Sequence, residues 1–538
     1  MDLELPLGKR TAFYRFFEIL PFVSSLFIIT LPVTLSLLHP LAGAIFVIVY
    51  IIIWLVKAIA MAIRSIQGFS ALRSATRLDW TLRLNELTDP ASALEAAAHR
   101  QGWRIKEHRN NLARLAAMPD AKKPADISQL VIIPTYNESY DVLAPTLTSL
   151  LDSTYDAKQM FVTIAYEERG GPDTEANVRR LEREFGSKFK EFYAIKHPAD
   201  LPDEVMGKGA NITYAGEHLW NILEKRGVDP ETVIVTTMDA DNRPHRSYFT
   251  AVTYEYLTAI SPRHISLQPM SLYLNNIWDV PAAMRVLATG NSMWNIVISQ
   301  RPHALRNFAA HSQSLAALID MNFWSKRTIV EDGHQFWRSY FRYDGDYSVT
   351  PIYVPIYQDA VLADKYTRTL KAQFVQNRRW AYGASDIPYV AERVFTKKRT
   401  VPFWSGFAKF ARLFDSHVSW SSASFILMLG AFAPLVISPL AGRSIVAHQL
   451  PNTASIIQQI ALFGLAVNVI VFFKMLPPRP KRYSWTRSVA MVLQWILTPI
   501  LGIIYSSAAA LSSQYRLATG KYLDKFAVTE KHVVRDEQ

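Results

Sequence analysis

The sequence has no cysteine among its 538 residues. This absence excludes a disulfide-stapled fold, thiolate metal sites, iron–sulfur clusters and cysteine nucleophiles. Charged residues are scarce as well, at 19% against about 25% in soluble domains, whereas hydrophobic residues reach 50%. Such a composition excludes a disordered or collagen-like chain. Because the excess apolar residues gather near the two ends, the sequence predicts an integral membrane protein with a large polar middle.

Two apolar stretches near the N-terminus, Ile19–Leu38 and Leu41–Ile63, are each long enough to cross a hydrocarbon core of about 30 Å. Lys and Arg precede the first stretch and follow the second, and the turn at His39-Pro40 carries none. The positive-inside rule then places the N-terminus and the polar middle in the cytoplasm. We expect a transmembrane hairpin over 1–65 and a cytoplasmic helical connector over 66–124.

Three more apolar stretches near the other end predict C-terminal membrane helices over 421–515. They are Ser421–Leu440, Ser455–Phe473 and Ser488–Tyr515. Pro499 lies in the middle of the last stretch, and a proline there removes a helix hydrogen bond and bends the chain. We therefore expect this stretch to bend and to keep a tail over 516–538 on the cytoplasmic side.

Between 401 and 420, four phenylalanines recur at helical spacing, opposite two basic residues. The phenylalanines are Phe403, Phe407, Phe410 and Phe414, and the basic residues are Lys409 and Arg412. This pattern predicts an amphipathic helix lying in the membrane interface. A helix packed into the protein core is the alternative.

From about 125 to 400 the chain alternates short apolar runs with helical stretches. Four runs predict buried parallel strands: Gln129–Pro134, Phe161–Tyr166, Glu191–Ile195 and Thr232–Met238. Helices are expected between them, including Asp173–Phe185 and Asn211–Arg226. We expect this range to form one α/β domain inserted between the membrane segments. Ligands of open α/β sheets bind at the carboxyl ends of the strands, so the residues that follow each run are the candidate contacts.

Asp239 and Asp241 follow the fourth run and flank a single alanine. Two carboxylates in so tight a turn can approach one hard cation. Mg²⁺ or Mn²⁺ held by one or two carboxylates completes its shell with phosphate oxygens and water. The pair therefore predicts a divalent metal that neutralises a diphosphate leaving group, and a solvated surface turn is the alternative.

Three further motifs accompany this pair in a fixed order: PTYNE at 134–138, Glu331-Asp332, and QNRRW at 376–380. With them the sequence resembles the membrane-embedded family 2 glycosyltransferases, the group of cellulose, chitin and hyaluronan synthases. The resemblance implies a GT-A fold, an inverting reaction and a nucleotide-diphosphate sugar donor, usually linked to uridine diphosphate. It also implies a bacterial inner-membrane protein. The sequence departs from the family in carrying Val330 where relatives have threonine.

The resemblance also implies roles for the motif residues. Asp332 corresponds to the general base and Glu331 to a residue that orients the base or the acceptor. The residues expected to bind the donor are Thr135, Tyr136, Glu138, Glu167, Lys208, Asp239, Gln376 and Arg379. Trp380 offers a flat face on which an acceptor sugar can stack. The plain alternatives are a helix cap for Asp332, core packing for Trp380 and a surface position for Lys208.

The tail over 526–531 resembles the FxVTxK loop of cellulose synthase, which closes over the donor. Its matching residues are Phe526, Val528, Thr529 and Lys531. A loop that excludes water from the donor would limit wasteful hydrolysis.

These observations predict a glycosyltransferase that extends a polysaccharide and passes it across the membrane. A non-processive transferase acting on a lipid acceptor is the alternative, because only five apolar stretches are left to line a channel. A catalytically silent nucleotide-sugar sensor is a third hypothesis, disfavoured by the intact carboxylates. The net charge of +12 is assigned to contacts with membrane lipids and phosphorylated donors rather than nucleic acid. The sequence predicts no particular oligomeric state.

Overall fold

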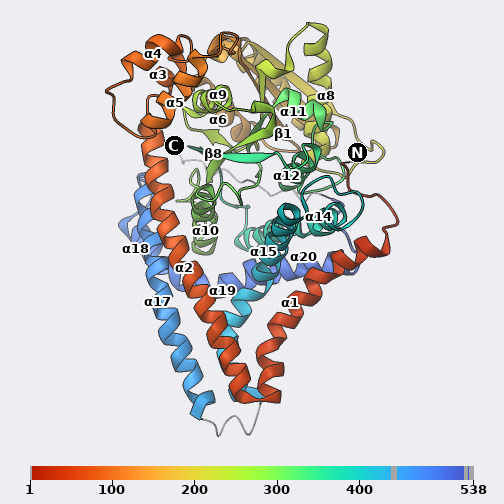
Figure 1. Cartoon of the computed structure of the whole chain (residues 1–538), viewed down its shortest axis with the longest axis vertical. Coiled ribbons are helices and arrows are strands. Elements are labelled where there is room, and N and C mark those ends of the chain that lie inside the picture. The colour runs from red at the N-terminus through yellow and green to blue at the C-terminus, as the bar shows by residue number, and fades with distance from the viewer. Residues whose placement is uncertain (1–2, 438–444, 526–530, 532–538) are drawn as a thin grey trace.

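The computed structural model describes residues 3–437, 445–525 and 531 (Figure 1). Five helical segments in these ranges are long and apolar enough to cross a membrane. They are Ala12–Leu38, Pro40–Arg77, Phe403–Val436, His448–Met475 and Trp485–Ala518. The five predicted apolar stretches coincide with these segments, so the sequence prediction of helices compatible with a membrane protein is confirmed.

The polar middle folds around one eight-stranded sheet with the strand order β3-β2-β1-β4-β7-β6-β8-β5. The strands are β1 (Ser128–Thr135), β2 (Met160–Glu167), β3 (Glu191–His197), β4 (Val233–Thr237), β5 (Arg243–Pro244), β6 (Ile265–Leu272), β7 (His311–Ser314) and β8 (Ser348–Tyr357). Strands β1 to β4 pair in parallel, which confirms the four predicted parallel strands. The other half of the sheet is mixed, because β7 runs antiparallel to both β4 and β6.

Both faces of β1, β2 and β4 are buried, which explains why these strands read as largely apolar runs, whereas the edge strand β3 is only partly buried. Val131 and Ile133 point into one core, where they pack with residues of helices α6, α7 and α9. Leu130 and Ile132 point into the opposite core with α8 and α11. These helices are α6 (Tyr140–Leu151), α7 (Gly171–Phe185), α8 (Lys208–Lys225), α9 (Tyr248–Leu257) and α11 (Leu315–Asp320). The predicted helices at 173–185 and 211–226 correspond to α7 and α8.

The N-terminal helices join the membrane segments to the sheet. Helix α1 (Ala12–Leu38) turns at His39 into the long α2 (Pro40–Arg77), and α3 (Trp80–Asn85), α4 (Pro90–Ala96) and α5 (Ile105–Ala116) follow. Trp80, Leu84 and Leu112 from this connector pack into the same core as α6 and α7. The connector is therefore part of the α/β body and not a loose linker.

The remaining helices before the C-terminal segments are α10 (Ala282–Ser299), α12 (Glu331–Arg342), α13 (Tyr366–Ala381) and α14 (Asp386–Phe395). The C-terminal helices are α15 (Phe403–Leu429), α16 (Ala433–Ile437), α17 (Ile445–Met475), α18 (Trp485–Leu493), α19 (Thr498–Leu501) and α20 (Ala509–Ala518). Figure 1 shows α1, α2 and α17 running along the long axis of the molecule, whereas α19 and α20 run across it beneath the α/β domain.

The last apolar segment is irregular around Pro499, as the sequence predicts. A 3₁₀ turn over Gln494–Leu497 precedes α19, and a π-helical stretch over Gly502–Ala508 follows it. Lys531 reaches Asp241 at the end of the sheet. Lys531 therefore lies against the α/β domain.

One continuous helix, α15, covers both the predicted interfacial helix and the start of the next apolar stretch. Phe410 is buried and its ring lies 4.9 Å from Phe395 and 5.6 Å from Phe17, measured between ring centroids. The phenylalanine face thus packs against the protein at Phe410, and the position of this helix in the membrane interface stays a prediction. Phe407 remains exposed.

Candidate active site

A cavity of about 490 Å³ lies at the carboxyl ends of the parallel strands. Every predicted site residue that the structure describes lines this cavity. They are Thr135, Tyr136, Glu138, Glu167, Lys208, Asp239, Asp241, Glu331, Asp332, Gln376, Arg379, Trp380 and Lys531. The other three predicted tail residues, Phe526, Val528 and Thr529, lie outside the described residues. The volume of the cavity is within the range of binding sites for small molecules and cofactors.

Strand ends and helix termini deliver these side chains to one place. The turns after β1, β2 and β4 supply residues 135–138, Glu167 and the 239–241 pair. Helix α8 begins at Lys208, α12 begins at Glu331, and the last turns of α13 carry residues 376–380. Gly209 permits the approach of α8 to α12, because a Cβ there would lie 2.4 Å from the Ser325 carbonyl oxygen and 3.0 Å from Glu331.

Lys208 is buried and bound on two sides. Its Nζ donates to Asp239 Oδ1 and to the carbonyl oxygen of Ala309, both at 2.8 Å. Burial alone would raise the pKa of Asp239, but the charges of Lys208 and Lys531 lower it to about 2. Burial alone would lower the pKa of Lys208, but the charges of Asp239 and Glu331 outweigh burial and raise this pKa. Lys208 is therefore a fixed cation of the cavity and not the surface lysine of the alternative interpretation.

Asp241 is buried beside a second lysine and a third aspartate. Lys531 Nζ lies 2.7 Å from Asp241 Oδ1, and the backbone N–H of Asp359 donates to Asp241 Oδ2 at 3.1 Å. Burial and the Asp241 charge raise the pKa of Asp359 to about 6. Asp359 Oδ1 is buried without a hydrogen-bond partner among the described residues.

The donor set at this point fits Mg²⁺ or Mn²⁺. Within the described ranges no cluster of three or more His, Cys, Asp or Glu is arranged to hold a metal ion. Asp239 and Asp241 nonetheless offer hard carboxylate oxygens, and the orphaned oxygen of Asp359 lies next to them. Magnesium is commonly held by only one or two carboxylates, with substrate phosphates completing its shell.

Glu331 and Asp332 occupy the first turn of α12 and differ in burial. The Glu331 side chain is 3% exposed, and its Oε2 has no hydrogen-bond partner in the described part of the chain. Burial and the neighbouring Asp332 raise the pKa of Glu331 to about 8. Burial also raises the pKa of Asp332, although the charge of Lys208 and a hydrogen bond from the Gly333 N–H lower it. The Gly333 N–H donates to Asp332 Oδ1 at 2.7 Å.

Two of the residues predicted to bind the sugar donor, Glu138 and Glu167, form hydrogen bonds or ion pairs with other residues of the protein. Glu138 Oε2 accepts from the Thr135 hydroxyl at 2.7 Å and from the Tyr136 N–H at 2.8 Å, which closes the turn after β1. Glu167 is buried and paired with Arg169 at 2.8 Å. Its Oε2 also lies 3.3 Å from Nδ1 of His197. Both carboxylates line the cavity, but their contacts hold loops in place.

The end of α13 joins the cavity to the last apolar segment. Asn377 Nδ2 donates to the Tyr505 carbonyl oxygen at 2.7 Å. Burial lowers the pKa of Arg379, and the charges of Asp239 and the α12 carboxylates oppose this change, so its guanidinium faces these carboxylates. The half-buried Trp380 ring lies 6.2 Å from the Tyr273 ring between centroids.

Sequence reasoning missed Asp359 and Tyr273, which also line the cavity. Asp359 follows the end of β8, and the same strand-end rule that found Asp239 would have found it. Strand β8 was hidden because Pro351 and Pro355 interrupt its apolar run, and proline within a run argues against a strand.

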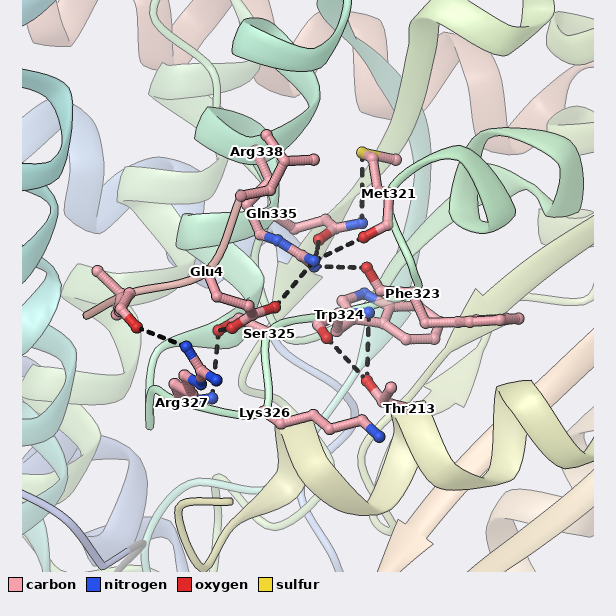
Figure 2. Close-up of polar contacts among 12 residues, drawn as sticks. Glu4, Thr213, Met321, Phe323, Trp324, Ser325, Lys326, Arg327, Gln335 and Arg338 are labelled. Carbon is pink, nitrogen blue, oxygen red and sulfur yellow. Dashed lines mark hydrogen bonds and ion pairs between the residues drawn. The ribbon is translucent and has the colours of Figure 1, made fainter. Parts of the chain in front are cut away.

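The loop that leads into α12 is held by residues from the far N-terminus (Figure 2). The Glu4 carboxylate lies 3.0 Å from Arg338 Nη2 and accepts from the Ser325 hydroxyl at 2.6 Å. Arg338 is buried and also donates to the carbonyl oxygens of Phe323 and Met321, at 2.5 and 2.6 Å. The N-terminal segment therefore contacts both the loop before α12 and the helix itself.

No protein-family model and no curated protein matches the chain. Among solved structures the chain is similar to the mannosyltransferase PcManGT from Pyrobaculum calidifontis in complex with GDP-Man and Mn²⁺. That match has 14% identity and a TM-score of 0.41, and it covers 86% of this chain and 100% of that one. It is also similar to S. aureus TarS 1–349, with 11% identity, 74% and 93% coverage and a TM-score of 0.36. With TM-scores below 0.5 these similarities carry no functional conclusion, and membership of family 2 stays a prediction.

Proposed function

We propose that the chain is an inverting membrane glycosyltransferase that transfers a sugar from a nucleotide-diphosphate donor, with UDP-sugar as the expected class. The observation that carries the proposal is the meeting of an acid pair, Glu331 and Asp332, with the fixed cations Lys208 and Arg379 in one cavity. Transfer with inversion needs one general base on the acceptor and stabilisation of the diphosphate leaving group. The cavity contains both.

In the proposed reaction Asp332 is the base and Glu331 keeps its proton. Two adjacent carboxyls cannot both ionise cheaply, and burial raises the pKa of Glu331, the more deeply buried of the two side chains, to about 8. The Asp332 carboxylate removes the proton from the acceptor hydroxyl while that oxygen attacks the anomeric carbon. The bond from the anomeric carbon to the diphosphate oxygen breaks, and the nucleoside diphosphate leaves with the bonding electrons. Protonated Glu331 can orient the acceptor by donating a hydrogen bond.

The leaving group would be received by cationic side chains. Lys208 and Arg379 supply fixed positive charge on the side of the cavity that contains Asp239, and a guanidinium suits phosphate geometry. A bound Mg²⁺ or Mn²⁺, held by Asp239 and Asp241, would supply Lewis-acid stabilisation of the same diphosphate. Trp380 would stack on the acceptor sugar, and the Tyr273 ring, 6.2 Å away between centroids, would support it.

We further propose that the acceptor is a growing polysaccharide whose synthesis is coupled to secretion. The support for this acceptor is the direct contact of α13 with the last apolar segment through Asn377 and Tyr505. Transfer to a lipid acceptor is a second candidate, favoured by one observation. Since α19 and α20 run across the long axis of the molecule (Figure 1), fewer helices remain to line a polymer channel.

The test uses the full chain in lipid nanodiscs with Mg²⁺ or Mn²⁺ and a panel of radiolabelled nucleotide sugars. We expect Asp332→Asn to lower the transfer rate by about 10²–10⁴-fold, the usual contribution of a general base, with donor affinity unchanged. Unchanged turnover would remove Asp332 as the base. A high-molecular-weight product would support the polysaccharide acceptor, and a short, lipid-extractable product would support the lipid acceptor.

A further inference from the structure

Five basic side chains gather where α2, the segment after α10 and the start of α15 meet. We call them the basic cluster: Arg64, Arg301, Arg306, Lys409 and Arg412, whose charges act on one another. Helix α2 passes close to α10 at Gly68, because a Cβ added there would lie 2.6 Å from the Ile296 carbonyl oxygen. Arg412 Nη1 donates to the His303 carbonyl oxygen at 3.0 Å. Three segments distant in sequence therefore bring their cations to one junction, and each of the five side chains is half-buried there.

Aromatic rings of α12 support two members of the basic cluster. The guanidinium of Arg306 lies 3.9 Å from the centroid of the Phe336 ring and 4.7 Å from that of Trp337. Lys409 Nζ lies 5.7 Å from the same Phe336 ring and 5.0 Å from Tyr340. Such contacts hold the side chains in place, but a ring face only partly offsets a cation.

No carboxylate neutralises the basic cluster in the part of the chain that the structure describes. None of its five side chains lies within 4.0 Å of an acidic group there. Asp386 is near enough to influence Arg306, but it is 2.6 Å from His334. Burial and the charge of Arg412 lower the pKa of Arg306 to about 9. The charges are thus crowded together without a counterion.

One nitrogen atom of the basic cluster also lacks a hydrogen-bond partner among the described residues. Arg301 Nε is buried without a hydrogen-bond partner in the described ranges. Burial and the charges of Arg64 and Arg412 lower the pKa of Arg301 as well. Unpaired buried donors and half-buried like charges are both costly. An anion bound here would relieve both costs at once.

We propose that the basic cluster binds a phosphate-bearing anion, and that this anion is the headgroup of an anionic phospholipid. Guanidinium groups match phosphate oxygens in a two-point geometry. Arg64, Lys409 and Arg412 lie on helical segments long and apolar enough to cross a membrane. Ile59 and Ile63, on the apolar stretch of α2 that leads to Arg64, are 48% and 52% exposed and offer a surface for acyl chains. Basic pockets between helices at the membrane surface are typical headgroup sites.

The proposal is independent of the proposed reaction, so its test needs no activity. The full chain is purified from nanodiscs of phosphatidylcholine and phosphatidylglycerol into neutral detergent, and retained phosphatidylglycerol is counted by native mass spectrometry. The cluster variant is Arg301→Gln/Arg412→Gln. The matched control is Arg73→Gln/Arg77→Gln, which removes the same charge from two exposed residues further along α2.

We expect wild type and the control to retain phosphatidylglycerol and the cluster variant to bind it about 30-fold more weakly, the scale set by two charges at a membrane surface. Equal binding by all three proteins, or equal loss in both variants, would overturn a specific site. Folding is checked by thermal unfolding without lipid, where removal of crowded like charges should leave the midpoint of the cluster variant equal or higher. A lower midpoint would refute the charge argument.

A second arm distinguishes the source of the phosphate. Thermal unfolding is measured with inorganic phosphate or with short-chain phosphatidylglycerol, against chloride at equal ionic strength. If the unfolding midpoint rises with the lipid alone, and this rise is absent in the cluster variant, the result supports binding of the lipid headgroup. An equal rise with inorganic phosphate supports the anion site but replaces the lipid by a soluble phosphate. No rise with either ligand would overturn the proposal.

Discussion

Replacing the buried Glu331 by glutamine should stabilise the fold at neutral pH. In the unfolded chain this carboxyl has its usual pKa of 4.5, and in the folded chain its pKa is about 8. The folded state therefore binds more protons than the unfolded state between these two values, and folding stability falls as pH rises through them. Glutamine cannot ionise, so the variant escapes this loss.

The magnitude follows from the two pKa values. Each pH unit above 4.5 costs the wild type about 1.4 kcal/mol until pH approaches 8. At pH 7.5 the sum has a ceiling of about 4 kcal/mol, and we expect about half of it after relaxation and water entry. At pH 5 the expected advantage of Glu331→Gln is below about 1 kcal/mol.

The assay is the apparent unfolding midpoint in one neutral detergent at pH 5.0 and pH 7.5. About 2 kcal/mol corresponds to a rise of roughly 3 °C, because the entropy of unfolding is about 2.1 cal/mol/K per residue over the α/β domain, and the rise should be present only at pH 7.5. Glu182→Gln, at an exposed position of α7, is the control and should show no rise. An equal gain at both pH values, or none at pH 7.5, would show that Glu331 is not held against its ionisation. Sugar transfer should fall in the stabilised variant, because stability and activity compete at such sites.

Three shorter predictions concern other parts of the site. Lys208→Met should weaken donor binding by about 10–100-fold and raise the pKa of Asp239, and donor titration with Lys208→Arg as the rescue variant checks this. Trp380→Ala should raise the KM for the acceptor with little change in donor affinity, which initial-rate kinetics separate from a folding defect. Glu4→Gln removes one charge from the contact with Arg338 and should lower the unfolding midpoint by about 2–4 °C, together with kcat; an unchanged kcat would restrict Glu4 to stability.

Much of the fold was predictable because many of its elements have a recognisable local sequence pattern. The strands β1, β2 and β4 are buried on both faces and therefore read as largely apolar runs, and the membrane-length helices stand out by their length. The mixed half of the sheet was not predictable in the same way. Strand β7 consists of His311–Ser314, with no apolar run, and it forms because its polar side chains hydrogen-bond across the sheet, as Ser312 does with Thr236 at 2.7 Å.

The candidate site shows the same division. Residues that follow a visible strand, such as Asp239, could be placed at the sheet edge from sequence alone. The contact of Glu4 with α12 could not, because 334 residues separate Glu4 from Arg338 and nothing local in either segment points to the other. The resemblance of the tail to a known loop drew attention to Lys531, but its ion pair with Asp241 was not predicted.

The charges of the cavity indicate how the proposed sugar transfer would depend on protonation and on a cation. Seven carboxylates and five cationic side chains line the cavity, so its wall is acidic when all of these groups are ionised. A nucleotide-diphosphate donor adds further negative charge and would be repelled by such a wall. Two features oppose this repulsion: Glu331 keeps its proton because its pKa is about 8, and Asp239 and Asp241 can share a divalent cation with the donor phosphates. In the proposed reaction, the depth of Glu331 would therefore serve donor binding as well as the acid–base step.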